Sequence, residues 1–106
     1  MKLAEKKCVP CEGGTSKLEG PQIQSYLKQI SQWKDVGDKI QKVFKFKNFI
    51  QAVGFVHQLA IVAEEEGHHP DFCVHYNQIT ITIWTHAISG LSENDFILAA
   101  KIDAIR

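Results

Sequence analysis

The sequence has no excess of charge of either sign and no long apolar run. Its 106 residues contain 12 basic and 12 acidic side chains. Because non-specific binding of nucleic acid needs lysines and arginines that neutralise phosphates, this balance argues against direct nucleic-acid binding. No segment approaches the roughly 20 apolar residues that cross a bilayer, and the start of the chain lacks the apolar stretch of a secretory signal. We therefore expect neither a membrane span nor export.

Cysteine is also scarce, since the chain has only three. This number is too small for a complete disulfide framework, so we expect a reducing, cytoplasmic environment, with the nucleus as the alternative compartment. The pair Cys8-Val9-Pro10-Cys11 has the spacing of half a zinc site or of a redox dithiol. No second pair completes a four-ligand site, and the motif lies in a Lys- and Gly-rich segment, so we interpret both residues as free thiols.

The length of the chain predicts one domain with a single core. Hydrophobic residues make up 44% of the sequence, which is typical of a packed globular protein rather than a disordered one. Residues 1–19 show no hydrophobic periodicity and include Gly13-Gly14, so we predict a flexible N-terminal arm. The folded domain is expected to occupy residues 20–106.

Three segments carry the apolar spacing of amphipathic helices. The first opens near Pro21, which fits the first helical position because that residue needs no N–H partner. The second begins after Asn48, an N-cap residue with a capping-box glutamine three positions later, and ends at Gly67, a typical left-handed terminator. The third follows Ser92, which forms another capping-box pattern with Asp95.

Four segments predict strands, because short runs of apolar and β-branched residues alternate with polar ones between turn residues. The turn near Asn77-Gln78 predicts a tight hairpin, and hairpins pair antiparallel. We therefore predict an α+β two-layer sandwich: a four-stranded antiparallel sheet covered by helices on one face, in the order α-β-β-α-β-β-α. The expected strands are 31–35, 39–47, 72–76 and 79–86.

Three histidines, His68, His69 and His86, fall in or after a run of carboxylates at residues 64–66. Imidazoles beside carboxylates can exchange protons near neutral pH, or they can bind a metal. Pro70 restricts His69 to extended geometry, so the adjacent rings should diverge, which makes a shared metal awkward. On spacing alone, acid/base chemistry, a three-histidine zinc site and three unrelated surface histidines all stay open.

An ordered set of short motifs narrows these alternatives. The set consists of His68-His69-Pro70-Asp71, Tyr76-Asn77, Thr85-His86 and Gly90-Leu91-Ser92-Glu93 followed by Asp95. Together these motifs resemble the pterin-4a-carbinolamine dehydratase family, and the resemblance runs from about residue 20 to the C-terminus. This resemblance implies an α+β enzyme that removes water from 4a-hydroxy-tetrahydropterin to give quinonoid dihydropterin, in the recycling of tetrahydrobiopterin. It implies no metal and no organic cofactor, and a small pterin as the substrate.

The resemblance also implies roles for single residues. His68, His69 and His86 match the three active-site histidines; we expect His68 and His86 to share the acid and base roles while His69 fixes the pterin. Phe72 stands where mammalian members have Trp and is expected to pack on the flat ring, and Asn94 stands where many members have Arg or Lys. The residues expected to bind the substrate are Glu64, Pro70, Phe72, Thr85 and Asp95, of which Asp95 could equally be only the capping partner of Ser92.

Self-association is the last expectation. The middle helix carries apolar residues, Phe55, Ile61 and Val62, beyond what one sheet should cover, which favours a subunit interface. The family that the chain resembles forms dimers and tetramers, so we expect a homodimer or a homotetramer. Mammalian members also act as dimerisation cofactors for a homeodomain transcription factor, so a binding module is the alternative function.

Overall fold

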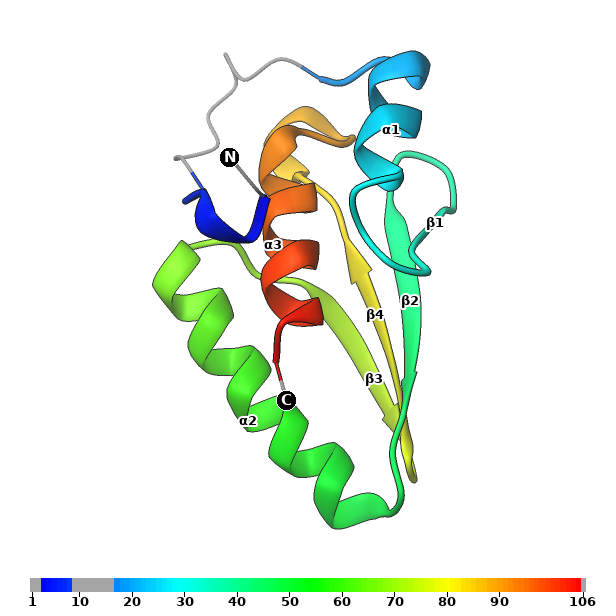
Figure 1. Ribbon diagram of the computed structural model, residues 1–106, viewed down its shortest axis with the longest axis vertical. Helices are drawn as coiled ribbons and strands as arrows, with labels where there is room; N and C mark the ends of the chain where they lie inside the picture. The colour runs from blue at the N-terminus through cyan, green and yellow to red at the C-terminus, as the bar shows by residue number, and fades with distance from the viewer. Residues whose placement is uncertain (1–2, 9–16, 106) are drawn as a thin grey trace.

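The structure is a computed structural model that describes residues 3–8 and 17–105. Helices pack against one face of a four-stranded antiparallel sheet (Figure 1), which confirms the predicted α+β class and the order α-β-β-α-β-β-α. The 3-10 helices η1 (Leu3–Glu5) and η2 (His86–Ile88) are additional. The main elements are α1 (Gly20–Leu27), β1 (Lys34–Asp35), β2 (Ile40–Lys45), α2 (Phe49–Glu66), β3 (Asp71–His75), β4 (Gln78–Ile83) and α3 (Glu93–Asp103).

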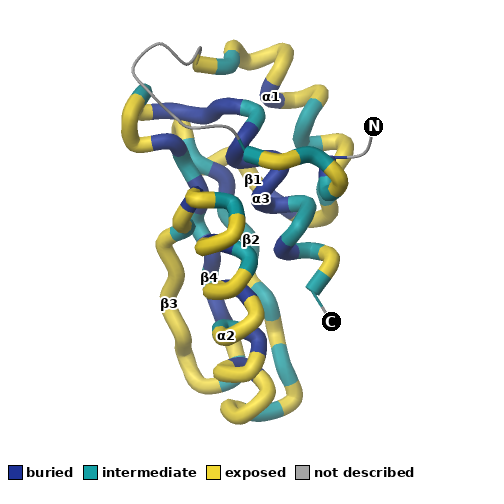
Figure 2. Tube along the Cα trace, turned by 90° about the vertical axis from the view of Figure 1, so that its left-hand side faces the viewer, coloured by how far each residue is buried: buried dark blue, intermediate teal, exposed yellow. Residues whose placement is uncertain are grey.

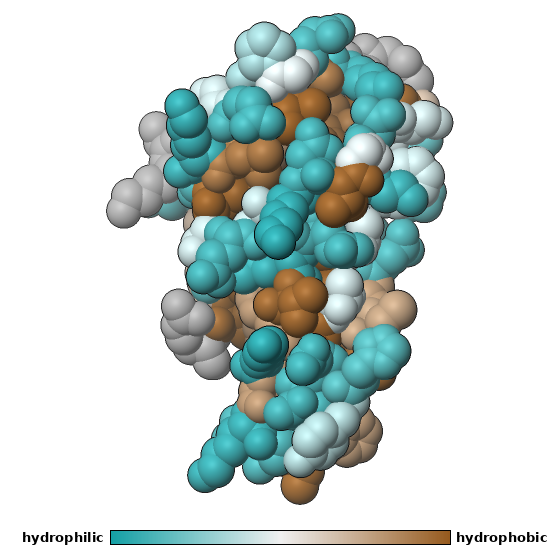
Figure 3. Space-filling model, turned by 90° about the vertical axis from the view of Figure 1, so that its right-hand side faces the viewer, coloured by the Kyte–Doolittle hydropathy of each residue, from teal (hydrophilic) through white to brown (hydrophobic). Residues whose placement is uncertain are grey.

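The sheet has the strand order β1-β2-β4-β3, which places β4 inside the sheet and β3 at its edge. Three isoleucines of β4, Ile79, Ile81 and Ile83, have an exposed fraction of 0%, because they lie under the helices. Strand residues alternate between faces, so the threonines between them lie on the uncovered side. The side of the molecule opposite α2 is mainly hydrophilic, with separate apolar patches (Figure 3). The period-two pattern of the sequence thus identified both faces of β4.

The ends of α2 follow the sequence closely. The Asn48 side chain accepts a hydrogen bond from the backbone N–H of Gln51 at 2.9 Å, which confirms the N-cap. A capping box also has a second bond, in which the N3 side chain accepts the backbone N–H of the N-cap residue. Here the Gln51 side chain accepts the N–H of Lys47 at 3.4 Å instead. At the other end Gly67 has φ 64° and ψ 27°, the left-handed conformation predicted for the terminator.

The helix α3 is the most buried element. It lies against the sheet, and α1, α2 and η1 pack around it (Figures 1 and 2). Seven of its 11 residues are buried, including Asn94 and Asp95 in its first turn. Because burying a carboxylate without partners is costly, Asp95 requires hydrogen-bond donors from its surroundings.

Two predictions differ from the structure: the exposure of Phe55 on α2 and the end of the predicted strand 79–86. Phe55 was expected to widen the outer surface of α2, but only 8% of it is exposed, since its ring packs 5.0 Å from the rings of both Phe44 and Phe46. Ile61 is 42% exposed and does face outward. The predicted strand 79–86 ends at Ile83, so His86 opens η2 rather than closing β4. The edge strand β3 is exposed along its whole length (Figure 2).

The start of the predicted N-terminal arm packs on the domain. Leu3 in η1 has an exposed fraction of 4%, and the Lys101 ammonium of α3 donates to the carbonyl of Ala4 at 3.0 Å. These contacts add residues 3–8 to the packed domain, whereas Cys11 and the pair Gly13-Gly14 lie outside the described residues. Among the described residues, no helix has both the length and the hydropathy of a membrane span.

Candidate functional site

One pocket lies where α2 ends, β3 begins and β4 continues into η2. Its volume is about 460 Å³. The structure thus brings the three predicted histidines, together with Pro70 and Thr85, to a single cavity. The residues that line it are Gly67, His68, His69, Pro70, Asp71, Trp84, Thr85, His86 and Ala87.

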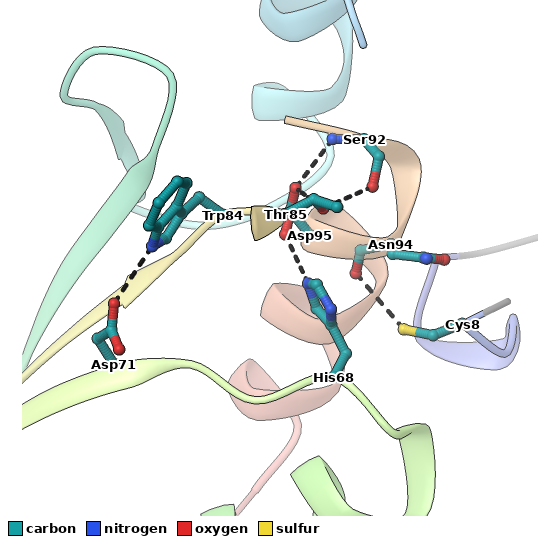
Figure 4. A network of polar contacts seen from close by, with 8 residues as sticks. All are labelled: Cys8, His68, Asp71, Trp84, Thr85, Ser92, Asn94 and Asp95. Atoms are coloured by element: carbon teal, nitrogen blue, oxygen red, sulfur yellow. Dashed lines mark hydrogen bonds and ion pairs between the residues drawn. The ribbon is translucent and has the colours of Figure 1, made fainter. Parts of the chain in front are cut away.

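His68 lies at the buried side of this pocket and is bonded to Asp95. Its Nε2 lies 2.6 Å from Asp95 Oδ1, and the Asp95 side chain is fully buried (Figure 4). The second carboxylate oxygen accepts the hydroxyl of Thr85 and the backbone N–H of Ser92, each at 2.8 Å. Thr85 and Ser92 both donate to this side chain, and a carboxylate only accepts, so we assign the proton of the His68 ring to Nε2. The Nδ1 atom of His68 remains as the second ring nitrogen.

The same network fixes the loop that carries His86. The hydroxyls of Thr85 and Ser92 lie 2.9 Å apart, and the N–H of Thr85 donates to the carbonyl of Gly90 at 2.8 Å. Asp95 therefore serves as the capping partner of Ser92, as its spacing predicted, and also as the partner of His68. It lies behind His68 and is not among the residues that line the pocket, so its predicted contact with the substrate stays a prediction.

His69 points its Nε2 at the carboxylate of Glu64, 2.9 Å away. Both side chains are largely exposed, at 60% and 78%. Ion pairs in this setting typically contribute about 0–1 kcal/mol. Glu64 is not among the lining residues, so the structure gives it a place beside His69 rather than in the cavity.

His86 is placed by a ring contact. Its imidazole centroid lies 3.9 Å from that of Trp84, with 33° between the planes. The Trp84 indole N–H donates to Asp71 at 3.2 Å (Figure 4). The Lys39 ammonium lies 4.5 Å from the centroid of the Trp84 ring. Sequence reasoning assigned no role to Trp84 or Asp71. The available signal was the alternation along β4, which places residue 84 on the uncovered face.

Phe72 occupies a different position from the one expected. It is 43% exposed and pairs with Ile81 across the ladder between β3 and β4. Directly opposite residues of an antiparallel pair point to the same face, so Phe72 shares the helix-covered side with Ile81. Phe72 does not line the pocket, and Trp84 is the aromatic side chain that does. The predicted contact of Phe72 with a flat ligand is therefore not supported by its position.

Residues 6–8 of the N-terminal segment form hydrogen bonds with the last residue of α2 and the first residue of α3. Glu66 accepts the N–H of Cys8 at 2.8 Å and pairs with Lys101 at 3.6 Å. Burial opposes ionisation of Glu66, but these two partners outweigh it and lower its pKa. The hydrogen bond from Lys6 to Glu93, at 2.7 Å, is the main reason that the pKa of Glu93 is also lowered.

Another groove, of about 560 Å³, lies at the far end of α2. Its lining includes three phenylalanines, Phe44, Phe46 and Phe55, and Lys45 is the one titratable side chain that the described residues contribute to it. The groove lacks the acid/base side chains that gather at the histidines. Within residues 3–8 and 17–105, no three His, Cys, Asp or Glu side chains converge in the way that a metal ion requires.

The sequence matches the family described as Pterin 4 alpha carbinolamine dehydratase over residues 16–105. A protein of Nitrosomonas eutropha is 48% identical over 104 residues, which are 97% of this chain and 92% of the relative. A protein of Alkaliphilus metalliredigens is 46% identical over 103 residues, which are 95% of this chain and 93% of the relative. Both carry the provisional name pterin-4-alpha-carbinolamine dehydratase.

Two solved structures are similar to this fold. One, described as a transcriptional coactivator/pterin dehydratase from Brucella melitensis, has a TM-score of 0.80 at 34% identity and covers 84% of this chain and 97% of its own. The other, a pterin dehydratase-like protein described as a RuBisCO assembly factor in the alpha-carboxysome, has a TM-score of 0.62 at 28% identity and covers 70% of this chain and 88% of its own. By sequence and by fold, the chain belongs to the pterin 4 alpha carbinolamine dehydratase family.

Proposed function

We propose that the protein is a 4a-hydroxytetrahydrobiopterin dehydratase, a hydro-lyase that converts the 4a-carbinolamine into quinonoid dihydropterin during tetrahydrobiopterin recycling. The observation that supports this most directly is the convergence of three imidazoles on one pocket in a member of this family. The cavity, at about 460 Å³, has the size of sites that bind small organic ligands. A flat bicyclic pterin belongs to that size class.

The reaction needs two proton transfers. The bond between carbon 4a and its hydroxyl oxygen breaks, the departing oxygen takes up a proton to leave as water, and the neighbouring ring nitrogen loses a proton. Each positioned acid or base typically contributes about 10²- to 10⁴-fold to the rate. Two imidazoles on different sides of the ligand can supply both transfers without a cofactor.

We assign these transfers to His68 and His86. His68 is bonded through Nε2 to the buried Asp95, so Nδ1 is the atom that exchanges a proton with the substrate. A carboxylate in this position fixes the tautomer and stabilises the protonated ring, as in hydrolase triads. His86 serves as the second group, from the opposite wall formed by η2. His69, oriented by Glu64, fixes the pterin, and Pro70 and Thr85 form part of the wall.

The decay of 4a-carbinolamine, followed by stopped flow, tests this function. Wild-type protein should accelerate decay, and His68→Ala and His86→Ala should each lower the acceleration by about 10²-fold or more. His57→Ala is a suitable control, since this exposed histidine of α2 does not line the pocket. Acceleration by His86→Ala equal to that of wild type would contradict the role of His86, and no acceleration by wild type would contradict the function.

A binding function is the second candidate, because part of the surface is apolar. A relative in the family is described as a transcriptional coactivator as well as a pterin dehydratase. A protein that shows no turnover but forms a stable complex with a transcription factor would support this candidate. The exposed apolar residues lie on α2 (Phe49, Ile50, Val53 and Ile61) and on β3 (Phe72 and Val74).

We also propose that the chain forms a homodimer or a homotetramer. β3 is an edge strand whose backbone is open to a further strand, and it carries the exposed apolar residues Phe72 and Val74. Further exposed apolar residues lie on α2. The formal net charge of zero leaves little repulsion between copies. Light scattering on purified protein gives the mass directly, and a monomer at micromolar concentration would contradict this proposal.

A further inference from the structure

Two charged side chains hold the indole of Trp84 at the wall of the pocket. Its indole is fixed from two other parts of the fold: Asp71, at the start of β3, accepts the indole N–H at 3.2 Å, and Lys39, just before β2, lies 4.5 Å from the ring centroid. The cation over the ring face and the charged acceptor at the ring edge are both favourable contacts. The indole is thus held on two sides before any ligand enters the pocket.

His86 depends on this indole. Its side chain is exposed, and among the described residues no hydrogen bond to it is found, in contrast to His68 and His69. An exposed side chain without partners samples several rotamers. The contact with Trp84, at 3.9 Å between ring centroids, is the interaction that selects one of them.

We propose that Trp84 is a positioning residue: fixed by Asp71 and Lys39, its indole holds the His86 imidazole in the orientation needed for proton transfer. This inference rests on the proposed dehydratase function and adds to it a residue that acts through His86. Catalytic groups work when their rotamers are fixed by their surroundings, and a displacement of about 1 Å can cost about 10²-fold in rate. Trp84 supplies that constraint where hydrogen bonds do not.

A double-mutant cycle tests this role. Trp84→Ala should lower kcat for the 4a-carbinolamine about 10- to 100-fold with little change in KM, because the catalytic group is misplaced rather than the substrate unbound. In a His86→Ala background the same substitution should lower kcat no further. Trp84→Phe, which keeps an aromatic plane, should retain most of the activity. An equal loss from Trp84→Ala in both backgrounds would overturn the proposal.

A second readout does not depend on turnover. The face of an indole shields protons that lie close to it. Since the ring centroids of His86 and Trp84 are 3.9 Å apart, the imidazole C–H protons of His86 should resonate upfield in the NMR spectrum of the wild type. Trp84→Ala should move them to the positions of free histidine, and Asp71→Ala, which leaves the indole in place but removes its acceptor, should move them part of the way. If the His86 resonances did not change in Trp84→Ala, the contact between the two rings, and with it the positioning role of Trp84, would be contradicted. Wild type that fails to dehydrate the carbinolamine would instead contradict the proposed function, while these shifts would still report on Trp84.

Discussion

His68 and His86 border the same pocket but are held in opposite ways. His68 is 9% exposed and bonded to a carboxylate that has two further donors. His86 is exposed and rests on an aromatic ring. The hydrogen bonds around His68 therefore also stabilise the fold, because removal of one partner leaves buried polar groups without a hydrogen bond. The exposed side can change with little cost to the fold. This contrast predicts which substitutions unfold the protein and which only slow it.

The largest effect should come from Asp95→Ala. This change leaves three buried donors, from His68, Thr85 and Ser92, without their acceptor. A buried donor left without its acceptor typically costs about 1–3 kcal/mol, so the loss of an acceptor shared by three donors should lower the free energy of unfolding by about 3 kcal/mol or more. Urea denaturation measures it. Trp84→Ala provides the comparison on the exposed side of the pocket. If Asp95→Ala lowered the free energy of unfolding less than Trp84→Ala does, the proposed difference between the two sides would be wrong.

Acid should have an intermediate effect through Glu66 and Glu93. Folding lowers the pKa of both carboxyl groups, so the folded state binds fewer protons than the unfolded state. Their stabilisation is complete above the unfolded pKa, about 4.3, and is lost as the pH falls through the lower folded values. Urea midpoints should therefore decrease between pH 7 and pH 3. The double variant Glu66→Gln/Glu93→Gln should show a weaker dependence, and an unchanged one would refute this origin.

The smallest effect should come from Glu64→Gln. The pair that Glu64 forms with His69 is exposed on both sides, so the free energy of unfolding should change by less than about 1 kcal/mol. Comparison with Asp95→Asn, the matching change in the buried pair, measures how much burial adds to the same type of contact. Equal losses from the two substitutions would show that burial does not distinguish the two histidines.

Much of the fold could be predicted from the sequence because its local signals agree with the final packing. Asn48, Gly67 and the pair Ser92 and Asp95 mark helix ends that the structure confirms. The isoleucines of β4 alternate as expected and identify the buried face. These signals involve residues close in the chain, whose geometry is fixed by backbone hydrogen bonds. They extend to His68 and His69, which directly follow such a helix end.

Other features depend on contacts between distant residues, which no local pattern encodes. The approach of Asp71 and Lys39 to Trp84 joins three separate segments of the chain. Phe55 has helical spacing that does not distinguish an outer surface from the core, and only the approach of β2 decided the matter. Alternation placed Phe72 on one face of an unknown sheet, and the pairing with Ile81 determined which face that is.

Gly67 shows how a residue without a side chain can determine the direction of the two histidines that follow it, His68 and His69. A Cβ atom at this position would have no neighbour within 4 Å, so contact with neighbouring atoms does not exclude a side chain there. Its φ of +64° is nevertheless a conformation that costs other L-residues about 1–2 kcal/mol. Tolerance at position 67 should consequently follow backbone preference instead of volume, with asparagine accepted more readily than the smaller alanine.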